Sequence, residues 1–274
     1  MYRDPIIFAG PPDPRTKSVL EELGFRFGDK GTHTSRTMML DELSMLLRAS
    51  EPTASRADYV KVVIEDNCLG KHTLSTRRLS LQRMTELYAL DPDVALFRLL
   101  RQFWYADEKA HGLLALIVAI ARDPLLRATC PVVLSMSPGE EMARQRFTDA
   151  IRDAVDGRLN ESTLDKVVRN AGSSWTQSGH FAGRNRKKRS RIEPTPVSAA
   201  FALVLGYMLG LRGHALFESL FARVLDRDEN ALTFLAMDAK RLGLLDIKSA
   251  GGVTVISFDP ILTEKEKKLI YGAH

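Results

Sequence analysis

The chain has 274 residues, of which 45% are hydrophobic and 27% charged, with 39 Lys and Arg against 34 Asp and Glu and a formal net charge of +5. That length and apolar content allow one large domain or two to three small ones. The two cysteines, Cys68 and Cys130, lie far apart and form neither a metal-ligand spacing nor a disulfide framework. No signal-peptide-like apolar stretch opens the chain, so we expect a cytoplasmic protein.

Two apolar runs, 112–121 and 194–211, need to be weighed as membrane spans. A helix needs about 20 apolar residues to cross a bilayer, and the first run is too short. The second begins with two prolines and contains Gly206 and Gly210, which leaves too few residues to span. We expect both runs to be buried core helices and expect no membrane contact.

Residues 1–31 are rich in Pro and Gly and predict an arm with one short helix over 15–23. The first strong helix is expected over 35–49, where apolar residues repeat at helical spacing and Ser35 can act as the N-cap.

A helix-turn-helix is predicted next. Residues 58–66 favour a helix, 67–71 contain a glycine suited to a turn, and Thr73 or Ser75 can cap a second helix that runs to about residue 90. No acid occurs from 67 to 83, and the start of the second helix is where such motifs contact DNA. The cations of this stretch are Lys71, Arg77, Arg78 and Arg83.

Residues 93–130 predict two helices whose aromatic stripe (Phe97, Phe103, Trp104, Tyr105) indicates packing rather than base stacking. Helices over 141–155 and 161–171 follow, the second capped by Asn160.

The most unusual composition lies in 166–192, which has no Asp or Glu but eight Lys or Arg, six of them within 184–191. Just before this cluster, residues 172–184 combine hydroxyl side chains, flat rings and glycines, which suit contact with a phosphate backbone. We therefore expect a mobile loop that binds nucleic acid, and a solvated loop that only carries charge is the alternative. The candidate residues are Ser174, Trp175, Thr176, Gln177, His180, Arg184, Arg186, Lys187, Lys188, Arg189 and Arg191.

The C-terminal part predicts helices over 197–211, 215–225 and 231–242, then a β-hairpin of 244–248 and 253–258 joined across a double glycine. Helix, helix and hairpin is the order of a winged helix. Acidic residues (Asp226, Asp228, Glu229, Asp238) lie near its expected reading helix, which disfavours phosphate binding. Docking to protein, a purely structural role and contact with DNA all stay open.

Motifs of catalysis are missing: the chain has no Walker A loop, GxGxxG, HExxH, GxSxG or CxxC pair. We expect no enzyme, cofactor, metal or small-molecule substrate. The alternative is a nuclease whose carboxylates come from distant parts of the chain.

Several stretches resemble the BrxA family of BREX phage-defence systems: GTHTSRTMMLDEL (31–43), EDNCLGKHTLSTRRLSLQRMTELYALDP (65–92), LFRLLRQFW (96–104), LLALIVAIARDPLLR (113–127) and SSWTQSGHFAGR (173–184). The resemblance implies a mostly α protein with a helix-turn-helix-like N-terminal part and a NusB-like helical bundle. It also implies double-stranded DNA binding without catalysis, beside other defence-system proteins. The DNA contacts that it implies are Lys71, Thr73, Ser75, Thr76, Arg77 and Arg78.

From these patterns we expect three parts: an arm plus helix-turn-helix-like domain (1–92), a helical bundle with a basic loop (93–195) and a winged-helix-like domain (196–274). The expected function is that of a non-enzymatic DNA-binding accessory protein of a bacterial anti-phage system. The alternatives are an assembly scaffold that binds an acidic protein, and RNA binding through a NusB-like surface.

Overall fold

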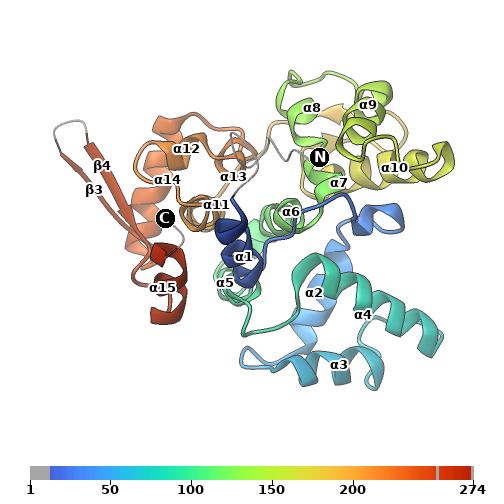
Figure 1. Cartoon of the computed structure of the whole chain (residues 1–274), viewed down its shortest axis with the longest axis horizontal. Helices are drawn as coiled ribbons and strands as arrows, with labels where there is room; N and C mark the ends of the chain where they lie inside the picture. Colours follow the sequence, from blue (N-terminus) through green and yellow to red (C-terminus); the bar gives the residue numbers. More distant parts are fainter. Residues whose placement is uncertain (1–12, 251–252, 273–274) are drawn as a thin grey trace.

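A computed structural model describes residues 13–250 and 253–272. This described part of the chain is mostly helical, with 60% helix and two small antiparallel sheets of two strands each. Figure 1 shows the arrangement of these elements. The predicted mostly α class is therefore confirmed, whereas residues 1–12 of the expected arm lie outside the described part.

The first elements are α1 (Pro14–Leu23), the short 3₁₀ helix η1 (Thr32–Thr34) and α2 (Leu40–Ala49). The predicted helix over 35–49 is wrong at its start, because α2 begins five residues later and Ser35 does not cap it. Hydrogen bonds to α10 (Glu161–Gln177) explain the difference. The Asn170 amide donates to the His33 carbonyl and the Met38 N–H donates to Ser174, which commits this backbone to an extended path.

The next two helices are α3 (Arg56–Ile64) and α4 (Leu74–Tyr88), which pack against each other. Thr73 is the N-cap of α4, one of the two caps expected from the sequence. Between the helices the chain turns through Asn67 and Gly70, both with positive φ, which glycine and asparagine tolerate best.

The middle of the molecule is built around α6 (His111–Arg122), whose residues from Leu113 to Ala121 are all buried. Around it lie α5 (Ala95–Trp104), η2 (Glu108–Ala110), α7 (Pro124–Arg127), α8 (Cys130–Leu134), α9 (Arg144–Ala154) and α10. The packing role expected for the aromatic stripe is confirmed for Phe97, Phe103 and Trp104, which are buried, and is wrong for Tyr105, whose side chain is exposed.

The basic segment differs from the expected loop in two ways. Helix α10 continues through Gln177, so residues 172–177 are helical. Strands β1 (Phe181–Ala182) and β2 (Lys188–Arg189) then pair antiparallel. We call residues 181–191 the basic hairpin. Its second strand also bonds to the preceding turn, through Arg189 N–H to the Glu140 carbonyl (2.8 Å).

The C-terminal part contains α11 (Pro196–Met208), α12 (Ala215–Glu218), α13 (Leu220–Arg223), α14 (Glu229–Arg241), β3 (Asp246–Ala250), β4 (Val253–Ser257) and α15 (Glu264–Gly272). The predicted hairpin is confirmed, with Asp246 opposite Ser257, and its two turn glycines lie outside the described residues. Helix α15 was not expected. Its start is fixed by reciprocal bonds between Thr263 and Glu266.

One hydrophobic cluster holds the molecule together and takes residues from all three expected parts, from Leu20 to Ile270. The two apolar runs weighed as membrane spans form α6 and α11, both inside this cluster. Within the described residues, every helix is too short or too polar to cross a bilayer.

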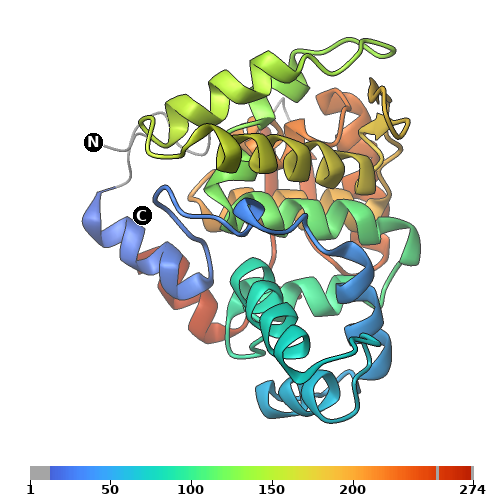
Figure 2. The ribbon, with the colours of Figure 1, turned by 90° about the vertical axis from the view of Figure 1, so that its right-hand side faces the viewer.

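Figure 2 shows the face that concerns the site. Helix α10 lies in the upper half and α4 in the lower half, and the blue segment around η1 crosses between them. The basic hairpin lies at the upper right, on the side away from α15 in both views.

Candidate nucleic-acid interface

The N-terminus of α4 exposes three of the residues implied by the family resemblance, Thr73, Ser75 and Thr76. Two of them also cap the helix: the Thr73 hydroxyl accepts the Thr76 N–H (3.2 Å), and the Thr76 hydroxyl donates to the Thr73 carbonyl (2.8 Å). Their exposure leaves this end of α4 open to a phosphate, while their capping bonds give them a role in folding as well.

The four cations predicted near this helix have different surroundings. Lys71 pairs with Glu42 at 3.1 Å and Arg83 pairs with Glu86 at 2.8 Å, both half-buried. Among the described residues, Arg78 is exposed and has no carboxylate partner. The helix therefore presents one uncommitted cation beside Arg77.

Arg77 stabilises the fold through hydrogen bonds to main-chain carbonyls. Its Nη1 donates to the carbonyl of Ile64 at the end of α3 (2.9 Å), and its Nε donates to the carbonyl of Lys71 in the turn (3.3 Å). These bonds fasten the two helices to the turn between them. The adjacent side chains of Arg77 and Arg78 thus have different roles, which sequence spacing does not reveal.

Three predicted contacts, two on the last turns of α10 and one just after it, are buried and cannot reach a nucleic acid in this fold. Ser174 bonds to Met38 N–H (2.8 Å), and the Trp175 indole donates to the Thr129 hydroxyl (2.7 Å). His180 contacts the Val224 carbonyl (2.8 Å), and burial lowers its pKa to about 4, so the ring is neutral near pH 7. The prediction that these three contact DNA is wrong, because the polar atoms are used inside the core.

Arg189 is also buried, and the prediction that it contacts DNA is wrong for the same reason. Its guanidinium pairs with Asp226 and donates to the carbonyls of Val133 (3.2 Å) and Ser190. The bonds to Val133 and Asp226 join the basic hairpin to α8 and to the turn after α13. Arg189 thus holds the other cations of the hairpin in place.

Two more predicted residues, Thr176 and Gln177, are half-buried on α10. The Thr176 hydroxyl accepts from the Lys187 ammonium at 2.8 Å, and the Gln177 amide donates to Thr37 at 3.3 Å. Burial lowers the pKa of Lys187, and no carboxylate pairs with it among the described residues. Lys187 therefore spans from the hairpin to α10 with its charge uncompensated.

The remaining predicted cations of the hairpin, Arg184, Arg186, Lys188 and Arg191, are all exposed. Within the described parts of the chain, none of the four has a carboxylate partner. An exposed cation without an internal partner loses little when it meets a phosphate, because no ion pair must first be broken.

A pocket of about 540 Å³, the hairpin pocket, opens between the basic hairpin and α10. Its lining includes Arg144 at the start of α9 and Arg169 on α10, neither of which was singled out from the sequence. Both arginines form ion pairs with the same carboxylate, that of Asp165, and Arg169 Nε lies 3.1 Å from Asp165 Oδ2. Its lining residues are Glu141, Met142, Arg144, Val168, Arg169, Gly172, Ser173, Arg184, Asn185 and Lys187.

The pocket depends on two glycines. A Cβ on Gly172 would lie 3.0 Å from the Met142 sulfur, so glycine allows the chain before α9 to approach α10. Gly183 has φ of +97°, and a Cβ there would meet the Arg186 carbonyl across the turn. These positions favour glycine because of backbone geometry, and the sequence alone showed only that glycines flank the basic run.

Below this surface lies a buried chain of hydrogen bonds that joins Asp123, His33 and Ser174. The Asp123 carboxylate is 2.8 Å from His33 Nδ1, and His33 Nε2 is 2.8 Å from the Ser174 hydroxyl. The residue order resembles a catalytic triad, but all three side chains are buried and the hydroxyl also bonds to Met38 and Asn170. We therefore assign it to the fold, where it fixes η1 between α7 and α10.

Within the described residues, no three His, Cys, Asp or Glu side chains gather as metal ligands. Comparison with known proteins finds neither a family model that matches the chain nor a similar curated protein.

Proposed function

We propose that the protein binds double-stranded DNA through its phosphate backbone, with the basic hairpin and the hairpin pocket as the principal contact. The observation that carries the proposal is the set of exposed cations without carboxylate partners: Arg184, Arg186, Lys188 and Arg191. Clustered cations of this kind bind phosphates with release of counterions, and they need no particular base sequence.

The surroundings of the hairpin support the same proposal. Buried Arg189 anchors the hairpin, so its exposed cations are presented at a fixed spacing and lose less freedom on binding. The pocket beside it adds Lys187, whose ammonium donates to the Thr176 hydroxyl and, within the described residues, has no carboxylate partner. The surface is thus cationic and preorganised, which favours a regular polyanion over scattered small anions.

We propose a secondary contact at the start of α4, where Arg78, Ser75 and Thr76 are exposed. In this proposal α3 and α4 act as a helix-turn-helix-like unit, the middle helices as a NusB-like bundle and α14 with β3–β4 as a winged-helix-like part. The role beside other proteins of an anti-phage defence system rests on the family resemblance described above.

The test is a binding assay with duplex DNA, single-stranded DNA and structured RNA of matched length, each at two salt concentrations. We expect duplex binding of about micromolar affinity that falls steeply with salt. Binding to RNA alone would favour an RNA-binding protein. Absence of any salt-dependent binding would refute the proposal and favour a scaffold that docks an acidic protein.

A further inference from the structure

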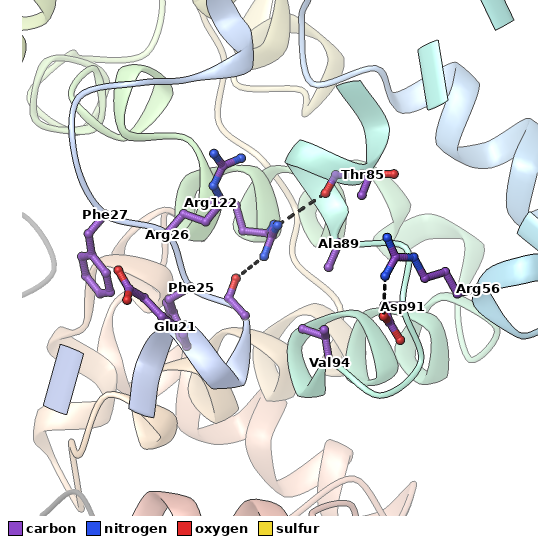
Figure 3. A pocket seen from close by; sticks show the side chains of 11 residues that line it. Glu21, Phe25, Arg26, Phe27, Arg56, Thr85, Ala89, Asp91, Val94 and Arg122 are labelled. Carbon is purple, nitrogen blue, oxygen red and sulfur yellow. Dashed lines mark hydrogen bonds and ion pairs between the residues drawn. The ribbon is translucent and has the colours of Figure 1, made fainter. Parts of the chain in front are cut away.

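A second pocket, the arginine pocket, lies away from the basic hairpin, where the end of α1 meets the start of α3 and the ends of α4 and α6 (Figure 3). Its volume is about 480 Å³, within the range of pockets that hold small molecules. Three arginines line it, Arg26, Arg56 and Arg122, together with apolar side chains such as Phe25 and Val94.

Arg26 and Arg122 meet at one main-chain oxygen. Arg26 Nη1 and Arg122 Nε both donate to the Glu86 carbonyl at 3.1 Å. Arg122 also donates to the carbonyls of Gly24 and Thr85, the two bonds drawn in Figure 3. All of these acceptors are neutral main-chain carbonyls at the end of α1 or α4.

The charges around the pocket do not balance. Across the described residues, neither Arg26 nor Arg122 has a carboxylate at ion-pair distance. Arg56 forms a long ion pair with Asp91, at 3.6 Å. Glu21, the other acid of the lining, pairs with Lys17 on the surface at 3.7 Å. Burial and the charge of Arg26 lower the pKa of Arg122 to about 9, as expected for a cation without a counter-ion.

A guanidinium has five N–H donors, and Arg26 uses one of them and Arg122 three in the bonds described. The free donors belong to two cations held side by side, an arrangement that matches the oxygens of a phosphate or a carboxylate. The apolar walls would suit the organic part of such a molecule.

We propose that the arginine pocket binds a small oxyanion, a phosphate or carboxylate group carried by a small molecule, between Arg26 and Arg122. The bound anion would join α1, α4 and α6 at the base of the α3–α4 unit. The site goes beyond the proposed DNA binding, because its residues are distinct from the basic hairpin and hairpin pocket.

The test is calorimetric titration at low chloride with inorganic phosphate, acetate and a nucleoside monophosphate. We expect saturable binding of phosphate with Kd of about millimolar order or tighter. Tighter binding of the nucleotide would identify an organic phosphate as the source, whereas equal binding would identify the free anion. Strongest binding of acetate would identify a carboxylate.

Arg26→Gln is the informative variant, because it removes a half-buried cation and one hydrogen bond. Arg36→Gln is the matched control, since Arg36 is also half-buried without a carboxylate partner but lies outside the pocket. We expect the first to weaken phosphate binding at least about tenfold and the second to change it less than about twofold.

The melting temperature of each variant, with and without phosphate, separates lost binding from lost folding. The site is supported if phosphate raises the melting temperature of wild type and of Arg36→Gln but not that of Arg26→Gln. No saturable binding to wild type, or equal loss in both variants, would overturn it and leave the two arginines as caps of α1 and α4. Duplex DNA binding by Arg26→Gln should stay unchanged.

Discussion

Replacing Arg77 with alanine should destabilise the protein, whereas replacing Arg78 should not. Arg77 donates two hydrogen bonds to main-chain carbonyls, those of Ile64 and Lys71, and truncation leaves both oxygens without that donor. Arg78 is exposed, and within the described chain it has no ion-pair partner to lose.

The expected magnitude follows from the two bonds. A hydrogen bond from a charged donor contributes about 1.5–3 kcal/mol, but Arg77 is half-buried and water can replace part of that. We therefore expect the unfolding free energy to fall by about 1–2 kcal/mol, which corresponds to roughly 2–4 °C in melting temperature for a chain of this size. Arg78→Ala should stay within about 0.5 kcal/mol of wild type.

The assay is urea unfolding of both variants, followed by duplex binding at several salt concentrations. Arg78→Ala should lower the steepness of the salt dependence by about one unit, as expected when one phosphate contact is lost. Equal stability of Arg77→Ala and wild type would refute the structural role of Arg77. Unchanged DNA binding by Arg78→Ala would remove α4 from the interface.

Three further changes test the architecture of the site. Gly183→Ala introduces a Cβ at φ of +97°, so we expect a distorted hairpin and a several-fold loss of duplex affinity in a titration. Arg189→Gln leaves Asp226 without its buried partner and should lower the unfolding free energy by about 3–5 kcal/mol in urea. Burial acts to raise the pKa of Asp123, but His33 and backbone donors outweigh it and hold the pKa below its ordinary 3.8. Its contribution to stability is therefore present above about pH 4 and lost as pH falls further, and Asp123→Asn should remove that part of the pH dependence of unfolding. Unchanged duplex affinity of Gly183→Ala would contradict the first prediction, and unchanged unfolding free energy of Arg189→Gln would contradict the second. The third would be contradicted if Asp123→Asn and wild type showed the same pH dependence of unfolding below about pH 4.

Much of the helical framework was predictable because local signals and hydrophobic periodicity agreed. Thr73 caps α4 and Asn160 caps α10, as their residue types indicated. The start of α2 was not predictable, since the bonds that hold residues 33–38 come from α10, about 140 positions later in the chain. Tertiary contacts overrode a local helical pattern there.

The candidate site was predicted as a region and not residue by residue. The absence of acids over 166–192 identified the region, because a segment without Asp or Glu stays cationic in whatever conformation it adopts. Composition did not separate buried Arg189 from exposed Lys188, since adjacent strand residues point to opposite faces and either face was possible. Arg144 and Arg169 were missed because their place beside the hairpin is set by the packing of α9 on α10.

The central claim, that exposed cations of the basic hairpin bind DNA phosphates, is tested most directly by fluorescence anisotropy with labelled duplex over a series of salt concentrations. The variant carries Arg184→Gln, Arg186→Gln and Lys188→Gln. Its matched control carries Lys17→Gln, Lys265→Gln and Lys268→Gln, an equal change of charge on α1 and α15, away from the hairpin (Figures 1 and 2). We predict that the hairpin variant loses about two to three units of salt dependence and at least about tenfold in affinity, while the control keeps both near wild type. Equal losses in the two variants, or none in the hairpin variant, would contradict the claim.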